Sequence, residues 1–277
     1  MSNKQITLYD NQAKQKDEIN FRHHHGAMHD GHFEIFIHGT NIKLYEGWNK
    51  VIIPGSMFTA VKHFPNINPK VKFPSYNEVL DLENTVSLTD AEWKDSFVTL
   101  FAVGIGGCGP ENSQVYDVDY TKWIQPKDLV PFRYQIADND LDGEMREKYF
   151  GRKPIPAEDR IAYYFKAFET EPVLVQQYVD GTSVDENIFT SDNTMEAETY
   201  VELKLTVLKE DCRDFFIATT GINDARINTI SLLTAYPKTI DGYTYYQNIK
   251  PLTKLNFPNE ALIDLTKGID ITYHIYY

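Results

Sequence analysis

The chain has 277 residues, of which 42% are hydrophobic and 24% are charged, and its formal net charge is −13. That apolar content supports one large folded domain or two smaller ones. The negative charge repels phosphate groups, which argues against direct binding to nucleic acid or to an anionic membrane. No segment reaches the roughly 18 apolar residues of a membrane span, and the polar first residues do not resemble a signal peptide. We therefore expect a protein made in the cytoplasm.

Two further features of the composition point to a β-rich protein with free thiols. Aromatic residues make up 13% of the chain, with 18 Tyr and 16 Phe, and such residues favour pleated, half-buried surfaces. The two cysteines, Cys108 and Cys212, lie far apart in the sequence. In a reducing compartment they are expected to remain unpaired.

The N-terminal segment is set apart from the rest of the chain by its polarity. Residues 1–32 are predicted to form an extended arm that ends in a histidine-rich loop, because they contain little apolar periodicity. Residues 33–277 are predicted to form a β-rich structural domain. A division of this domain into two sub-domains, with a break near residues 110–160, is left open.

The β-rich domain begins with a predicted hairpin. Residues 33–38 alternate between apolar and polar side chains, and a Gly-Thr-Asn turn leads to a second strand over residues 42–45. Residues 55–63 are predicted to form a short helix that ends before Pro65. Residues 64–96 contain many Pro, Asn and Asp residues and are predicted to be a long loop.

Later segments predict further strands. Residues 199–207 show the clearest alternation, which places Val201 and Leu203 in the core and directs Tyr200 outward. Residues 138–151 are predicted to be a charged loop with one helical turn. The fold class is therefore mainly β, an antiparallel sandwich or barrel with long loops and little helix. The predicted strands are residues 97–103 (central), 161–169, 199–207, 215–219, 226–234 and 269–277.

Five short segments, in this order, resemble a recurring group of tailed-bacteriophage virion proteins, from residue 49 to the end of the chain. They include a strand that breaks at a Gly-rich turn, an Ile-Asn strand and a final alternating strand. The chain departs from the group at Thr229 and Ser231, where an acidic residue and a glycine are usual. The matching segments are Asn49–Gly55, Ala102–Gly106, Ile227–Leu232, Lys254–Phe257 and Ile269–Tyr277.

The resemblance implies a non-enzymatic structural component of the virion, located in the tail, baseplate, neck or head surface. Its partners would be other virion proteins and copies of itself, and it would bind no nucleic acid, membrane or cofactor. No catalytic residues come with the resemblance. The place in the virion is left open, because the segments 64–96 and 110–160 are long for the group.

Two clusters of potential metal ligands were weighed against ordinary structural roles. His25, His29 and His32 have the spacing of three or four residues that lets imidazoles share a metal ion. Asp138, Asp140 and Asp142 match the first ligands of a calcium loop, but position twelve holds a tyrosine in place of the bidentate acid. A polar histidine loop and an ordinary acidic turn are the favoured interpretations.

Residues 104–109 satisfy the Gly-x-Gly-x-x-Gly pattern of dinucleotide-binding proteins. Pro110 follows directly, and no helical pattern comes after it, although the motif needs a helix there to bind a pyrophosphate. We therefore predict a turn that allows two backbones to approach closely. Cys108 within this turn is expected to be a small buried residue rather than a nucleophile.

The alternative function is a metal-dependent enzyme or a carbohydrate-binding β-sandwich. It would use one of the two candidate metal clusters, with tryptophans for stacking against sugars. The three tryptophans are Trp48, Trp93 and Trp123. A fold of this class is compatible with either function, so the fold by itself does not choose between them.

Overall fold

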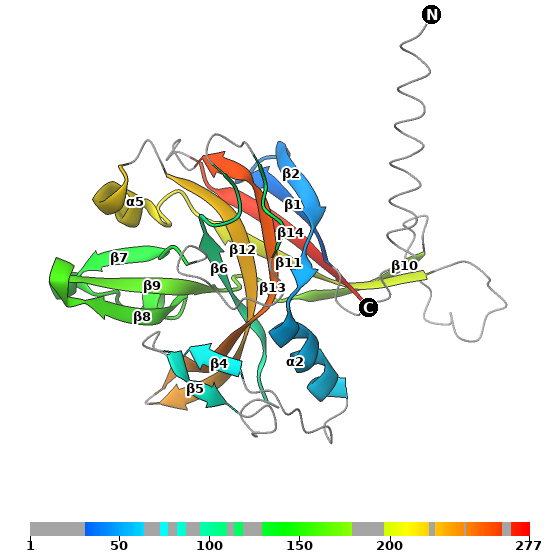
Figure 1. The fold of residues 1–277 in the computed structure, drawn as a ribbon, viewed down its shortest axis with the longest axis horizontal. Helices are drawn as coiled ribbons and strands as arrows, with labels where there is room; N and C mark the ends of the chain where they lie inside the picture. The colour runs from blue at the N-terminus through cyan, green and yellow to red at the C-terminus, as the bar shows by residue number, and fades with distance from the viewer. Residues whose placement is uncertain are drawn as a thin grey trace, which may run out of the picture.

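The computed structural model shows a mainly β protein built from two antiparallel sheets (Figure 1). This confirms the predicted fold class, and the two sheets pack as a sandwich. The described residues are 31–63, 73–76, 82–86, 95–109, 114–118, 129–178, 197–221, 225–240, 242–261 and 267–277.

The first sheet has five strands in the order β10-β11-β14-β1-β2, all antiparallel. Alternation with a period of two fixes which face of each strand is buried. The predicted hairpin is confirmed, and the strand after its turn extends to Trp48. The strands are β1 (Gly31–Ile37), β2 (Lys43–Trp48), β10 (Val173–Tyr178), β11 (Ala197–Val207) and β14 (Ile269–Tyr276).

The second sheet contains nine strands among the described residues. Its main path is β5-β4-β13-β12-β6-β9-β7, with β3 paired to β13 and β8 paired to β9. The strand predicted to be central, β6, does lie between β12 and β9. The strands are β3 (Lys50–Val51), β4 (Phe73–Tyr76), β5 (Leu82–Val86), β6 (Phe97–Gly104), β7 (Arg133–Ile136), β8 (Tyr149–Ile155), β9 (Arg160–Ala167), β12 (Arg226–Ile240) and β13 (Tyr243–Ala261).

Helices are few and short in the described part of the chain. The predicted helix over residues 55–63 is confirmed as α2 (Ile53–His63), and the helical turn in the charged loop is α4 (Gly143–Arg146). The strand predicted near residues 215–219 is wrong, because α5 (Arg213–Thr219) occupies it. A short apolar run such as Phe-Phe-Ile-Ala fits either state, and here only Phe216 of the helix is buried.

The loop predicted over residues 64–96 is wrong in part, because β4 and β5 lie within it and extend the second sheet. Strand β4 pairs with β13 at one position, Tyr76 to Ile249. These strands are too short to show a clear alternation in the sequence. Pairing with a long neighbouring strand, rather than local pattern, accounts for their presence.

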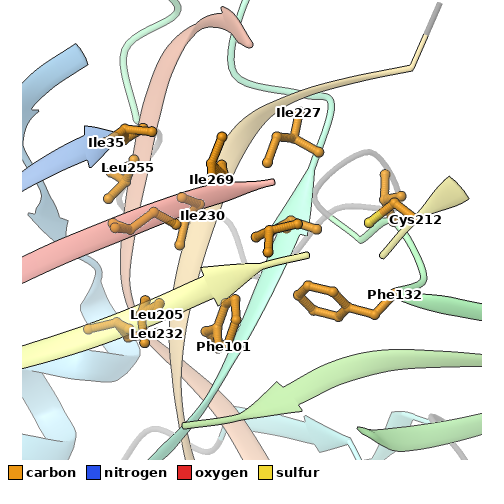
Figure 2. Packing of buried hydrophobic residues seen from close by; sticks show 14 of the residues in the cluster. Ile35, Phe101, Phe132, Leu205, Cys212, Ile227, Ile230, Leu232, Leu255 and Ile269 are labelled. Atoms are coloured by element: carbon orange, nitrogen blue, oxygen red, sulfur yellow. The ribbon is translucent and has the colours of Figure 1, made fainter. Parts of the chain in front are cut away.

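One large hydrophobic core fills the space between the two sheets (Figure 2). Ile35, Leu205 and Ile269 from the five-stranded sheet face Phe101 and Ile230 of the other sheet. Residues from both sides of the segment 110–160 therefore share this core. In β14 the burial alternates residue by residue, as the sequence predicted.

Three parts of the fold extend away from the sandwich (Figure 1). Strands β7, β8 and β9 form a wing on one side, and β10 projects with the end of β11 on the other. The long β12–β13 hairpin continues past β6, since β12 pairs with that strand only as far as Ala235. These extensions offer strand edges and hairpin ends beyond the common core.

Candidate assembly surface

The predicted histidine cluster is described only at His32, because His25 and His29 lie outside the described residues. His32 was predicted to be the last residue of the arm, but it belongs to β1, which begins at Gly31, and its ring lies 5.1 Å from that of Trp48. Burial lowers the pKa of His32 and outweighs the opposing effect of Glu34 and Glu46. The neutral imidazole is thus favoured, and it packs as an aromatic ring.

The three predicted aspartates have separate structural roles. Asp140 accepts hydrogen bonds from Tyr163 at 2.6 Å and from Arg152 Nε at 3.1 Å. Asp142 accepts from the amide of Met145 and caps α4, while Asp138 is exposed in a short 3₁₀ turn. Their oxygens do not converge as calcium ligands would. Within the described ranges, no group of three or more His, Cys, Asp or Glu side chains is placed to hold a metal ion.

A buried charged cluster joins the wing to the turn before α5, and the sequence interpretation missed it. We call it the Asp211 cluster; its members are Arg133, Tyr149, Lys166 and Asp211. Lys166 Nζ lies 3.0 Å from Asp211 Oδ2, and both side chains are completely buried. The Tyr149 hydroxyl donates to Asp211 Oδ1 at 2.7 Å and accepts from Arg133 Nη2 at 3.1 Å. The signal in the sequence was a single lysine within the apolar run 161–168.

Within the Asp211 cluster the Lys166 ammonium is fully paired. The three protons of the Lys166 ammonium have three acceptors within 3.0 Å, on Asp211, Glu169 and the carbonyl of Thr206. Burial raises the pKa of Tyr149, and the charge of Asp211 raises it further. The neighbouring Cys212 is completely buried, and that burial raises the pKa of its thiol. Both groups are therefore held in their protonated, unreactive forms.

A second cluster, neutral and rich in asparagine, fixes the Gly-rich turn. We call it the Asn228 cluster; its members are Gly107, Asn228, Thr229, Asn256 and Asn259. The amide of Gly107 donates to Asn228 Oδ1 at 2.7 Å, and Asn228 Nδ2 donates to Asn259 Oδ1 at 2.7 Å. A Cβ on Gly107 would lie 2.1 Å from the carbonyl oxygen of Asn228. The predicted close approach of two backbones is therefore confirmed.

Cys108 follows Gly107 and is buried, as predicted, and the two cysteines form no disulfide. It lines a hollow of about 360 Å³ together with Tyr116, Thr220 and Arg226. None of the described residues that line this hollow is a histidine or a carboxylate. A cysteine nucleophile needs a neighbouring base, so the described surroundings of Cys108 do not form such a pair.

The outer face of the five-stranded sheet carries a row of aromatic rings. Neighbouring rings in this row are 4.6–5.9 Å apart, and their planes are tilted by 36–60°. Tyr200 was predicted to point outward; it does so, but its neighbours in the row bury it. Tilted rings pack on one another and do not form the flat platform that sugar stacking would use. The members are Trp48, His32, His274, Tyr276 and Tyr200; Trp93 and Trp123 lie outside the described residues.

Exposed apolar side chains occur at the margins of the fold. Val173 and Leu174 of the edge strand β10 are 54% and 62% exposed, Ile42 lies beside the β1–β2 turn, and Tyr243 lies at the end of the β12–β13 hairpin. An apolar groove of about 280 Å³ runs between α2 and the C-terminal end of β14, with exposed Phe97 at its border. A contiguous apolar surface such as this groove is typical of sites where another protein packs.

Comparisons of the chain with protein-family models, with curated proteins and with solved structures found no match. Among the residues described by the structure, no helix has the length and apolar character needed to cross a membrane. The functional assignment therefore depends on the chain's own residues and geometry.

Proposed function

We propose that this protein is a non-enzymatic structural component of a tailed-phage virion, in the tail, baseplate, neck or capsid surface. It acts by assembly with other virion proteins and with copies of itself. The observation that carries this proposal is that exposed apolar side chains, among them Val173, Leu174 and Tyr243, lie on a strand edge and a hairpin end outside the hydrophobic core. Extensions of this kind offer surface to neighbouring subunits.

The interior supports the same proposal. The groups whose chemistry could serve a reaction, Lys166, Asp211 and Tyr149, hold one another in a closed, buried arrangement. Their contacts join the wing to the turn at residues 208–212, so they fix the angle at which the wing projects. Rigid placement of projecting elements is what a subunit with a geometric role requires.

The Asn228 cluster joins two of the segments that carry the resemblance to virion proteins. Two of the matching segments, Ala102–Gly106 and Ile227–Leu232, are neighbours in the sheet through β6 and β12. The Asn of the second segment holds the turn that follows the first. The pattern thus corresponds to one structural unit, a Gly-rich turn fastened to the adjacent strand.

The charge of the chain sets the expected partners and location. A net charge of −13 disfavours contact with the packaged genome and with anionic membranes. We expect synthesis in the host cytoplasm, followed by incorporation into the particle through contacts between proteins.

The test is to find the chain in purified particles. Virions of the phage that encodes this sequence should contain it in a constant number of copies after extensive washing and nuclease treatment, measured by quantitative mass spectrometry. Antibodies against the chain should label one fixed place on the particle in electron micrographs. Absence of the chain from infectious particles would refute the proposal.

A control experiment addresses the alternative function. Untagged protein should contain less than stoichiometric zinc and calcium by elemental analysis, and it should bind no sugar on a glycan array. Stoichiometric metal, or saturable binding of one glycan class, would favour the metal-dependent or carbohydrate-binding reading instead.

A further inference from the structure

Lys166 and Asp211 bring an amine and a carboxyl group into contact in a place that excludes water. Both side chains are completely buried, and Nζ of Lys166 lies 3.0 Å from Oδ2 of Asp211. The carboxyl carbon is one bond away from that oxygen, so the nitrogen is close to the separation of about 3–3.5 Å from which bond formation begins. An amine and a carboxyl group held in this way can condense to an amide.

Burial favours the amide over the ion pair. Two charges withdrawn from water carry a desolvation penalty that can exceed their mutual attraction, whereas an amide is neutral. The two groups also belong to one folded chain, and the effective molarity of a well-oriented intramolecular reaction reaches about 10⁵–10⁸ M. Exclusion of water hinders the reverse reaction, since hydrolysis needs a water molecule at the same carbon.

A third group, Glu169, is placed to carry a proton between the two. Its Oε1 lies 2.9 Å from Nζ of Lys166, so the carboxylate can accept a proton from the nitrogen as the new bond forms. Glu169 is 36% exposed and lines a hollow of about 570 Å³ together with Glu147 and Phe168. This hollow offers the released water a path to the solvent.

The other carboxyl oxygen of Asp211 faces two donors. The Tyr149 hydroxyl donates to Oδ1 at 2.7 Å, and Arg133 Nε lies 3.6 Å from the same atom. Burial raises the pKa of Tyr149, and the charge of Asp211 raises it further, so the hydroxyl keeps its proton. Attack on the carboxyl carbon develops negative charge on Oδ1, where these two donors already lie.

We propose that Lys166 and Asp211 form an amide bond within the folded chain, with the loss of one water molecule. One ammonium proton passes along its hydrogen bond to Oδ2 of Asp211, which leaves a neutral amine and a neutral acid. The lone pair of Nζ then forms a bond with Cγ, and the π electrons of the Cγ–Oδ1 bond move onto Oδ1. Glu169 accepts a second proton from the nitrogen and passes it to Oδ2. The Cγ–Oδ1 double bond re-forms, the Cγ–Oδ2 bond breaks, and Oδ2 leaves as water.

The reaction is a single, slow event in each chain, and no group is oxidised or reduced. The Tyr149 hydroxyl and the amide of Leu208 donate to the two oxygens of Asp211 and thereby also stabilise its carboxylate form. This stabilisation opposes the first proton transfer. Freshly folded protein therefore contains the ion pair that the structure shows, and the amide accumulates during storage.

The bond joins β9 of the wing to the turn before α5. Its two residues are 45 positions apart, and a cross-link over such a separation stabilises a fold by restricting the unfolded chain. The inference goes beyond the proposed assembly role and does not depend on it, because the bond forms in the isolated chain. Failure to find the amide would leave the virion proposal untouched, and absence of the chain from particles would leave the amide untouched.

The first test is intact-mass spectrometry of the untagged full chain under denaturing conditions, at purification and after prolonged storage at neutral pH. A growing fraction of the chains should be lighter than the sequence mass by one water molecule. Digestion with trypsin should then yield one branched peptide that contains both Lys166 and Asp211. A mass that stays at the sequence value throughout would overturn the proposal.

The position of the loss separates the proposed bond from another reaction that releases water. An aspartate that precedes a glycine can close onto its own backbone to form a succinimide, and Asp142 precedes Gly143 in this chain. That product gives an unbranched peptide without Lys166. A loss of water found only at an Asp-Gly sequence would therefore overturn the proposal.

The second test compares two exposed glutamates. Glu169→Gln removes the proton carrier and should slow formation of the amide at least about hundredfold. Glu147→Gln is the matched control, because Glu147 lines the same hollow but is not one of the three acceptors of the Lys166 ammonium. It should leave the rate unchanged. Both side chains are exposed, so both variants should fold, as circular dichroism can show.

The third test addresses the donor to Oδ1. Tyr149→Phe keeps the ring but removes the hydroxyl, and it should slow the reaction at least about tenfold. Tyr163→Phe is the matched control, since it removes a hydroxyl that donates to a different carboxylate, that of Asp140. An unchanged rate in both Glu169→Gln and Tyr149→Phe would overturn the proposal.

Discussion

The Asp211 cluster and the Asn228 cluster both hold one segment of the chain against another, but they do so with different chemistry. The first is charged and fixes the wing of β7, β8 and β9 through Lys166, Asp211 and Tyr149. The second is neutral and fixes the Gly-rich turn through amide side chains. Each has a buried centre, at Lys166 and Asp211 in the first and at Asn228 and Thr229 in the second, and both join segments that lie far apart in the sequence.

Because one cluster is charged and the other is neutral, they depend to different degrees on a single residue. Removing one member of a buried ion pair leaves an uncompensated charge without water, which is strongly destabilising. Removing a neutral acceptor leaves one unsatisfied N–H group, which costs less. The charged cluster should therefore be the more fragile of the two, although it is the more extensively bonded.

The largest effect is expected for Asp211→Ala. This change removes the buried carboxylate that pairs with the Lys166 ammonium, and it should lower the free energy of unfolding by about 3–5 kcal/mol. Urea denaturation followed by tryptophan fluorescence measures this. Glu169→Gln is the control, because Glu169 contacts the same ammonium but its side chain is 36% exposed. It should cost about 1 kcal/mol or less, and equal costs for the two variants would show that burial of the carboxylate does not decide how much its loss destabilises the fold.

A smaller effect is expected for Asn228→Ala. The amide of Gly107 loses its acceptor in a buried place, at a cost of about 1–3 kcal/mol. The comparison within the cluster is Asn256→Ala, which loses an exposed bond to the carbonyl of Tyr116 and a part-buried bond from the Thr229 hydroxyl and should cost less. Urea denaturation under the conditions used for Asp211→Ala gives the comparison. A cost for Asn228→Ala as large as that for Asp211→Ala would contradict the difference between charged and neutral clusters.

Asp140 offers an intermediate case, a partly buried carboxylate that titrates. Burial acts to raise its pKa, but hydrogen bonds from Tyr163, from the amide of Leu141 and from Arg152 outweigh this, so the pKa lies below 3.8. The stabilisation is therefore complete above pH 3.8 and is lost as the pH falls through the lower folded pKa.

The variant Asp140→Asn should lower the free energy of unfolding by about 1–2 kcal/mol at neutral pH. It should also remove part of the acid-induced loss of stability below pH 3.8. Urea denaturation at a series of pH values measures both, with the exposed Asp138→Asn as the control. Identical pH profiles for Asp140→Asn and the unchanged protein would show that the Asp140 contacts do not stabilise the fold.

The smallest effect is expected at the surface. Lys43 contacts Glu34 and Glu46 on the exposed side of β2, and exposed ion pairs contribute little. Lys43→Ala should change the free energy of unfolding by less than about 1 kcal/mol, and that change should shrink further in high salt. Thermal unfolding at two salt concentrations tests this. A loss comparable with that of Asp211→Ala would mean that exposure does not separate the two kinds of ion pair.

Several elements of the fold were predictable because their signal is local. The alternation in β1, β11 and β14 indicates both strand and buried face. The helix α5 was mistaken for a strand because seven residues carry too short a pattern to separate the two periods. Strands β4 and β10 gave no clear signal, since their places depend on long neighbouring strands.

The candidate sites were harder to predict from the sequence than the strands were. The clusters noticed first, His25 to His32 and Asp138 to Asp142, drew attention because similar residues lie together in the sequence. The Asp211 cluster assembles residues up to 78 positions apart, from Arg133 to Asp211. A lysine in an apolar run indicates that a negatively charged partner must lie nearby. The run does not indicate which carboxylate is that partner.

Alternating apolar residues were enough to predict a mainly β fold, an antiparallel sandwich or barrel, and the run of glycines was enough to predict a turn, because a period of two and the conformational freedom of glycine are local properties. Which strand became the open edge, and which acid neutralises Lys166, followed from how the sheets pack. Asp211 is 45 residues from Lys166, and Asn228 is 121 residues from Gly107. Contacts over such separations depend on the relative placement of whole strands, which no local pattern encodes.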